Sequence, residues 1–248
     1  MAIYHQCEQR TPEWHALRRG VVTASDVHRI VTPTGRLSSQ APDYAHRLLA
    51  EMMLGKELDN PETEWMTRGI ALEDSAWNSY EMINSVETDR GGFVTDDSGR
   101  LGCSPDRLIG KDGILELKCP APNNVIGYLL DPNSLHSEKK PQIQMQLLIC
   151  EREYCDLMAY HPEMPPVIVR CKRDDIYIKT LSTALSAFVD TLLAARVKLE
   201  TLYGPFPQIA IAQPPPDDGL DGLGFDVTPE DVAQILERGV STVTEGKR

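Results

Sequence analysis

The chain lacks the paired cysteines that build small zinc sites. Its 248 residues include six cysteines, but no two of them stand in a C-x-x-C arrangement. This spacing excludes zinc knuckles and ribbons, whose ligands come in closely spaced pairs. In a reducing compartment we expect these cysteines to be free thiols, most of them buried.

The sequence also lacks a long uninterrupted apolar run. A membrane-spanning helix needs about 20 predominantly apolar residues, and we expect no such segment and no membrane partner. The N-terminal stretch MAIYHQCEQRTPEWHALRRG has no apolar region of the kind that signal peptides contain. We therefore expect a cytoplasmic protein. An ordinary apolar fraction of 41% predicts a globular core, and no internal repeat is visible.

Basic residues are scarce relative to acidic ones. The chain carries 25 Lys and Arg against 37 Asp and Glu, a formal net charge of −12. Phosphate contacts dominate nucleic-acid binding, so this balance predicts weak, salt-sensitive non-specific binding. The charge is uneven, however. Positions 10–47 hold six arginines against three acids, whereas positions 204–248 hold eight acids against three bases. A local basic patch can still guide a polyanion.

Apolar periodicity and turn residues divide the chain into helical and extended segments. Helical spacing predicts helices over residues 11–20, 23–31, 41–55, 61–83, 121–130, 137–150 and 175–204. Thr23 or Ser25 is the expected N-cap of the second, and Pro141 is expected in the first turn of the sixth. Short β-rich pieces lie at 91–96, 100–110, 113–119, 154–160 and 167–171. This order predicts an α/β or α+β core with a mixed sheet.

The composition changes near residue 204. Residues 205–224 are rich in proline, glycine and acid, which is typical of a linker. A short capped helix is predicted over 228–239, followed by a disordered end. We therefore expect one domain over residues 1–203, and a linker with a short helix and tail over residues 204–248.

Two charged side chains share one face of the apolar segment LELKCP at residues 115–120. Successive strand residues point to opposite faces, so Glu116 and Lys118 point one way while Leu115 and Leu117 point the other. One interpretation is a half-buried strand whose solvated face carries a salt bridge. The other is a metal site with a lysine beside it.

An aspartate upstream favours the metal site. Asp106 follows Pro105, and a turn at GKDG (110–113) would form a hairpin that brings Asp106 near Glu116. Pro105 blocks strand pairing and leaves room for a ligand. Two close carboxylates stay ionised best around a cation, and oxygen ligands favour Mg²⁺ or Mn²⁺. With Lys118 to act on water, such a site can hydrolyse a phosphodiester.

Two further groups are candidates for the same site. Glu73 lies on the helix predicted over 61–83 and could present a third carboxylate, although a solvated helix face also explains it. The run QIQMQ lies on the helix over 137–150. Gln142 and Gln146 share one helical face, so only part of this run can face the site.

Five segments resemble, in order and spacing, the motifs of bacteriophage lambda exonuclease and its YqaJ-type viral recombinase relatives. They are WHALRRGVVTASDV, RGIALED, CSPDRL, LELKCP and QIQMQ. This family belongs to the PD-(D/E)xK nuclease superfamily, and the resemblance runs from about Trp14 to about Tyr160. It implies a restriction-endonuclease-like core, with a central mixed sheet flanked by helices, in residues 1–203.

The resemblance implies a role for each motif residue. Asp106, Glu116 and the Leu117 carbonyl would bind Mg²⁺, with Mn²⁺ as an alternative. Lys118 would act on the attacking water with help from Gln142, and Glu73 matches the family's helix glutamate near the metal. The residues that match a pocket for the 5′-phosphate of a DNA end are Arg18, Ser25 and Ser104. A guanidinium and two hydroxyls supply suitable donors, and Ser25 at a helix N-terminus would add the helix dipole.

The resemblance also implies an activity and partners. The family degrades one strand of linear duplex DNA processively from the 5′ end, as a ring-shaped homotrimer, and leaves a 3′ overhang for a single-strand annealing protein in phage recombination. A ring that encloses DNA needs no strongly basic exterior. The implied setting is the bacterial host cytoplasm, with a phage or prophage gene.

The sequence departs from the family pattern at Lys139, where lambda exonuclease has a tyrosine. A lysine there could still contact phosphate. The residues after 204 also exceed the lambda-like pattern and could bind the annealing protein or a neighbouring subunit.

Three other functions are open. The same chemistry serves a restriction or junction-resolving endonuclease, which would cut closed circles. A non-catalytic DNA-end-binding protein would need neither Lys118 nor a divalent ion. A two-carboxylate glycosidase explains neither Lys118 nor the arginines.

Overall fold

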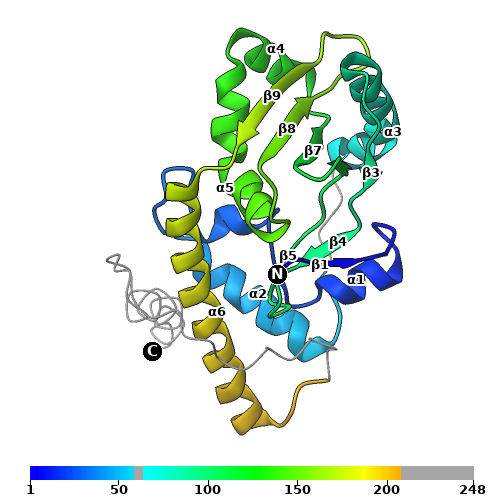
Figure 1. The fold of residues 1–248 in the computed structure, drawn as a ribbon. Coiled ribbons are helices and arrows are strands. Elements are labelled where there is room, and N and C mark those ends of the chain that lie inside the picture. The colour runs from blue at the N-terminus through cyan, green and yellow to red at the C-terminus, as the bar shows by residue number, and fades with distance from the viewer. Residues whose placement is uncertain (59–63, 208–248) are drawn as a thin grey trace, which may run out of the picture.

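The computed structural model describes residues 1–58 and 64–207, which form six α-helices and nine strands (Figure 1). The helices are α1 (Pro12–Arg18), α2 (Ala41–Leu54), α3 (Glu64–Asn84), α4 (Pro122–Leu130), α5 (Pro132–Ile149) and α6 (Asp175–Tyr203). The strands are β1 (Ile3–His5), β2 (Val22–Thr23), β3 (Asp89–Arg90), β4 (Phe93–Thr95), β5 (Leu101–Cys103), β6 (Arg107–Ile109), β7 (Gly113–Lys118), β8 (Tyr154–Ala159) and β9 (Val167–Lys172). The helix predicted over 228–239 and the predicted disordered end lie outside the described residues.

The strands form two mixed sheets rather than one. One sheet has the order β1-β4-β5-β2, and the other has the order β3-β6-β7-β8-β9. β2 runs parallel to β5 and β7 runs parallel to β8, whereas the remaining pairs are antiparallel. The predicted mixed α+β class is confirmed. The expectation of a single sheet is too simple, because the chain leaves β5 at Cys103 and starts β6 in a different sheet.

Apolar side chains cover both faces of β7, which lies inside the second sheet. On one face, Leu115 and Leu117 pack with Ala76 and Tyr80 of α3. On the other, Ile114 belongs to the larger core, and α5 packs over β8 and β9. The predicted alternation along LELKCP is therefore confirmed. Glu116 lies on the face of β7 that is covered by α5.

A buried hydrogen bond fixes α3 over the sheet. Asp156 of β8 is 2% exposed and accepts a hydrogen bond from the Tyr80 hydroxyl at 2.5 Å. The Arg170 guanidinium donates to both oxygens of Asp156 at 2.8 Å. Burial and the neighbouring Asp156 carboxylate raise the pKa of Tyr80, so the hydroxyl keeps its proton. This contact sets the place of α3, and therefore of Glu73.

The segment over 23–31 contains only a three-residue 3₁₀ turn, Val27–Arg29, and the predicted helix is wrong. Strand pairing explains the difference: Val22 and Thr23 pair with β5, and Ala24 N–H donates to the Gly102 carbonyl at 2.9 Å. Asp26 occupies the N-cap position without a side-chain cap. Neither Thr23 nor Ser25 is therefore a helix cap.

Helix α5 starts earlier than its pattern predicts. Asp131 caps it by accepting from Asn133 N–H at 3.1 Å, and Pro132 follows at the first helical position. Pro141 consequently lies inside the helix, not in its first turn. A helix-interior proline leaves the carbonyl four residues earlier without its donor. That residue is Ser137, which is exposed, so water can serve its carbonyl.

Helix α6 contradicts the expectation that no segment has the length and composition to cross a membrane. Its 29 residues include an 18-residue window that is long enough and apolar enough to cross a membrane, judged by length and composition alone. However, 44% of the window is buried within the protein, and Leu181, Leu185 and Phe188 pack in the larger core. Phe188 also stacks on Tyr44 of α2, with ring centroids 5.8 Å apart. These contacts are those of a core helix.

Candidate active site

The β6–β7 hairpin places the carboxylates, as predicted. Arg107 pairs with Leu115 and Ile109 pairs with Gly113, and the same register continued by two residues would place Pro105 opposite Leu117. Proline has no N–H, so Pro105 cannot donate to the Leu117 carbonyl. Instead Asp106 Oδ2 accepts from Leu117 N–H at 2.6 Å. The ladder thus ends at the Arg107–Leu115 pair, and beyond it the Asp106 carboxylate lies along the same strand edge as the Leu117 N–H and carbonyl.

Glu116 is a buried carboxylate held by three donors. Its side chain is only 4% exposed. Oε1 accepts from Lys118 Nζ at 2.5 Å and from Gln142 Nε2 at 2.6 Å, and Oε2 accepts from Gln146 Nε2 at 2.7 Å. The face shared by Glu116 and Lys118, and the face shared by the two glutamines, are both as predicted. The salt bridge also exists, but on a buried face and not on a solvated one.

Gln144, between those glutamines, points elsewhere. Its Nε2 donates to the Lys172 carbonyl at 2.9 Å, and its Oε1 accepts from Asp174 N–H at 2.8 Å. Gln144 therefore ties α5 to β9 and to the start of α6. Its role is structural, while Gln142 and Gln146 face the site.

The electrostatics of the site suit a cation. Burial raises the pKa of Asp106 well above its usual range, and the charge of Glu116 raises it further. Burial alone would lower the pKa of Lys118, but the charges of Glu116 and Asp106 outweigh burial, and the net shift is upward. One lysine faces two carboxylates, so negative charge is in excess whenever Asp106 and Glu116 are both ionised. A divalent ion on Asp106, Glu116 and the Leu117 carbonyl would relieve this repulsion.

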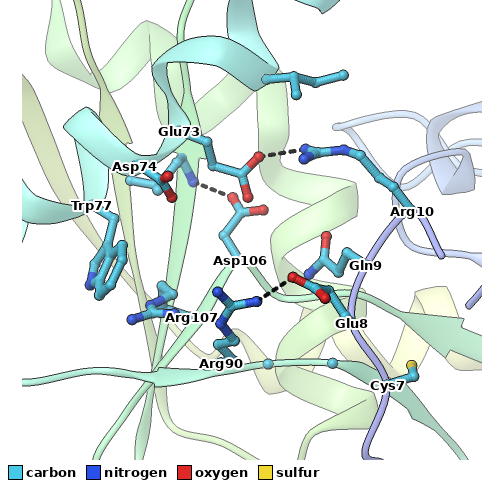
Figure 2. Close-up of a pocket in the computed structure, with 14 residues that line it drawn as sticks. Cys7, Glu8, Gln9, Arg10, Glu73, Asp74, Trp77, Arg90, Asp106 and Arg107 are labelled. Carbon is cyan, nitrogen blue, oxygen red and sulfur yellow. Dashed lines mark hydrogen bonds and ion pairs between the residues drawn. The ribbon is translucent and has the colours of Figure 1, made fainter.

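Glu73 faces Asp106 across the cleft (Figure 2). Its Oε2 accepts a hydrogen bond from Arg10 Nη2. No group of three or more His, Cys, Asp or Glu side chains within residues 1–58 and 64–207 is arranged to hold a metal. The metal-binding hypothesis therefore rests on two carboxylates and a backbone carbonyl, a donor set that Mg²⁺ accepts when water completes its shell.

A cleft of about 480 Å³ opens over these groups. Its walls include Glu73, Asp106, Lys118 and Lys139. Lys139 Nζ contacts Glu138 Oε1 at 2.8 Å and is 29% exposed. The lysine that departs from the family pattern thus lies at the cleft that Lys118 also lines.

Trp14 connects two of the three residues predicted to bind a 5′-phosphate. The Arg18 guanidinium lies over the Trp14 ring, 4.2 Å from its centroid, and Trp14 Nε1 donates to Ser104 Oγ at 2.8 Å. Ser25 Oγ lies 3.1 Å from Thr23 Oγ1. Thr23 and Arg18 both line a second cavity of about 750 Å³.

The contacts of the predicted phosphate pocket differ from expectation in two ways. Arg18 Nε lies 3.5 Å from Glu57 Oε1, while Glu57 Oε2 lies 2.6 Å from His15 Nδ1. An acidic side chain thus neighbours the predicted phosphate-binding guanidinium. Ser25 also precedes a single 3₁₀ turn, not a helix, so the predicted dipole contribution is absent there.

Gln146 contacts Glu116 directly, as its shared face with Gln142 indicated, although no task was predicted for it. Two further residues near these cavities were not predicted. Trp14 links Arg18 to Ser104, and Arg10 reaches Glu73. The four-residue spacing of Trp14 and Arg18 was an available local signal, whereas the contacts of Trp14 with Ser104 and of Arg10 with Glu73 span more than 60 positions and leave none.

A family model, the YqaJ-like viral recombinase domain, matches residues 13–153, more than half of the chain. The fold is similar to that of an alkaline exonuclease (LHK-Exo) from Laribacter hongkongensis, with TM-score 0.70 and 30% identity over 77% of this chain and 97% of that one. The same enzyme in complex with dAMP matches with TM-score 0.70 and 29% identity over the same shares.

A phage-related exonuclease from Haemophilus somnus 129PT shares the fold, with TM-score 0.57 and 13% identity over 71% of this chain and 96% of that one. No curated protein sequence matches the chain significantly. The resemblance predicted from the five motifs is confirmed.

The different roles of neighbouring glutamines give a stability test. Gln144→Ala should lower the free energy of unfolding by about 1–3 kcal/mol, because the Asp174 N–H and the Lys172 carbonyl both lose the partner that the fully buried Gln144 supplies. Gln142→Ala should lower it less, because Glu116 keeps Lys118 and Gln146. Urea denaturation followed by circular dichroism measures both. Equal losses would contradict the distinction.

Proposed function

The chain belongs to the YqaJ-like viral recombinase domain family, and we propose that it is a Mg²⁺-dependent 5′→3′ exonuclease. Its proposed substrate is linear double-stranded DNA, of which it degrades one strand processively and leaves a 3′ single-stranded overhang. The observation that carries the proposal is the convergence of Asp106, Glu116 and Lys118 at one end of the β6–β7 hairpin, open to a cleft. The similarity to an alkaline exonuclease supports it.

Each residue of the site has a proposed task. Asp106, Glu116 and the Leu117 carbonyl hold the divalent ion, Mg²⁺ or Mn²⁺. When bound, such an ion activates water and polarises the phosphoryl group. Lys118 orients the attacking water and stabilises the negative charge that develops on phosphate. Gln142 and Gln146 fix the carboxylate of Glu116, and Gln142, the more exposed of the two, also positions the water.

Arg18, Ser104 and Ser25 are proposed to bind the 5′-phosphate of the DNA end. Trp14 supports this by holding the Arg18 guanidinium on its ring and Ser104 on its indole N–H. An arginine fixed in this way can donate in fork geometry to phosphate oxygens. Glu57, which now neighbours Arg18, must give way to the phosphate.

The proposed setting is phage-type homologous recombination in the bacterial host cytoplasm. The proposed partners are DNA ends, a single-strand annealing protein and two further copies of this chain in a ring. A ring accounts for processive action by a protein of net charge −12, because enclosure retains DNA where non-specific attraction is weak.

Cleavage of linear and closed DNA distinguishes the proposal from its main rival, an endonuclease with the same chemistry. With Mg²⁺, the wild-type protein should shorten a 5′-phosphorylated linear duplex from its 5′ ends and leave a covalently closed circle intact. EDTA should abolish the reaction, and Lys118→Ala should slow it by about 10²-fold or more. Gel analysis of end-labelled strands measures this.

Each other outcome has a distinct meaning. Cutting of the circle would favour the endonuclease. DNA binding without any metal-dependent loss of either substrate would favour a DNA-end-binding protein that lacks catalysis.

The 5′-phosphate pocket predicts a substrate preference. Wild type should degrade a 5′-phosphorylated duplex about 10- to 100-fold faster than a 5′-hydroxyl duplex, the worth of a hydrogen bond to a charged group. Arg18→Ala should remove this preference by slowing only the phosphorylated substrate. Arg36→Ala, which removes an exposed arginine outside the cavities, is the control and should retain it. A preference unchanged by Arg18→Ala would overturn the assignment.

A further inference from the structure

Arg10 occupies a backbone conformation that suits glycine. Its φ is 68°, in the left-handed region. It is the third residue of a turn from Glu8 to Thr11, closed by Thr11 N–H to the Glu8 carbonyl at 3.4 Å and by the Thr11 hydroxyl to the same oxygen at 2.7 Å. Glycine takes a positive φ at this turn position without strain. Strained residues gather where function demands a particular side chain.

The Arg10 side chain lies at the meeting point of three cavities. The cavity around Asp106 and Arg107 has a volume of about 330 Å³, the cleft over Lys118 about 480 Å³, and the cavity around Arg18 about 750 Å³. Arg10 and Ile70 line all three. Arg10 therefore supplies positive charge on the route between the predicted 5′-phosphate pocket and Asp106.

Its present partner is a carboxylate on the opposite wall. Arg10 Nη2 donates to Glu73 Oε2, and Figure 2 shows the guanidinium reaching from the N-terminal segment toward α3. The Arg10 side chain is 46% exposed and that of Glu73 is 29% exposed. Ion pairs as exposed as this one contribute little to stability. Stability alone therefore does not explain an arginine at a position where glycine would fit without strain.

We propose that Arg10 binds a backbone phosphate of the strand being degraded, in the cleft that Arg10 lines together with Asp106. The inference rests on the proposed function and adds a substrate-binding residue to it. A guanidinium pairs with a phosphodiester oxygen as readily as with a carboxylate. Without DNA, Glu73 keeps the guanidinium aimed across the cleft. When DNA binds, the Arg10 guanidinium leaves the Glu73 carboxylate for a phosphate oxygen, while the Arg10 backbone stays in place.

The salt dependence of binding tests this contact. Each phosphate contact contributes about 0.7–0.9 to the slope of log K against log salt. The parent is Lys118→Ala with Mg²⁺ present, which retains the carboxylates but should not cleave. The probe is a fluorescent 5′-phosphorylated linear duplex, followed by anisotropy between 50 and 200 mM NaCl. In this parent, Arg10→Gly should weaken binding about 10-fold and reduce the slope by about 0.7–0.9.

Two further variants separate charge from backbone strain. Arg10→Ala should weaken DNA binding as much as Arg10→Gly does. It should melt at a lower temperature than Arg10→Gly, because alanine keeps the strained φ and glycine relieves it. Arg36→Ala, charge-matched and exposed, should leave the slope unchanged. A loss of affinity in Arg10→Ala alone would indicate a folding effect and overturn the inference.

The outcomes distinguish this inference from the function on which it rests. If the parent binds the duplex and Arg10→Gly keeps its affinity and slope, the Arg10 contact is overturned while the nuclease proposal stands. If the parent shows no salt-dependent binding to the duplex, both are overturned.

Discussion

The burial of Glu116 is the constraint around which the rest of the site is arranged. A carboxylate this deeply buried is costly unless donors or cations surround it. Here β7 supplies Lys118 and α5 supplies Gln142 and Gln146. Three donors on two elements fix the position of α5 against β7. With Asp106 nearby, the carboxylates outnumber the lysine, and ionisation of both carboxylates is favourable only with a further cation, which a divalent ion supplies.

The end of the β6–β7 ladder makes that completion possible. A ladder continued past Arg107 would occupy the Leu117 N–H and carbonyl with backbone partners. Pro105 prevents this, since it has no N–H, and Asp106 takes the Leu117 N–H instead. The other wall of the cleft is α3, which carries Glu73 and is anchored by Tyr80 to Asp156. A local sequence feature, Pro105, thus leaves the Leu117 N–H and carbonyl free of strand pairing with β6. A long-range contact, from Tyr80 to Asp156, holds the opposite wall of the cleft in place.

Those side-chain positions of the site that depend on residues close together in the sequence could be predicted. Alternation along LELKCP, the GKDG turn and the four-residue spacing of Gln142 and Gln146 place their side chains correctly. Prediction failed where tertiary contacts overrode local preference. Pairing of Val22 and Thr23 with β5 leaves only a 3₁₀ turn after them, and the cap at Asp131 places Pro141 inside α5. The contact of Arg10 with Glu73 spans 63 positions, which no local pattern reports.

Direct measurement of metal binding tests the central claim, that Asp106 and Glu116 form a divalent cation site. Mn²⁺ can be titrated into the metal-free protein and the free ion followed by electron paramagnetic resonance. The account predicts saturable binding to wild type that Asp106→Asn and Glu116→Gln each abolish or weaken by at least about 10-fold. Asp112→Asn, in the exposed hairpin turn, should bind as wild type does. Absence of binding to wild type, or binding that both active-site substitutions leave unchanged, would contradict the account.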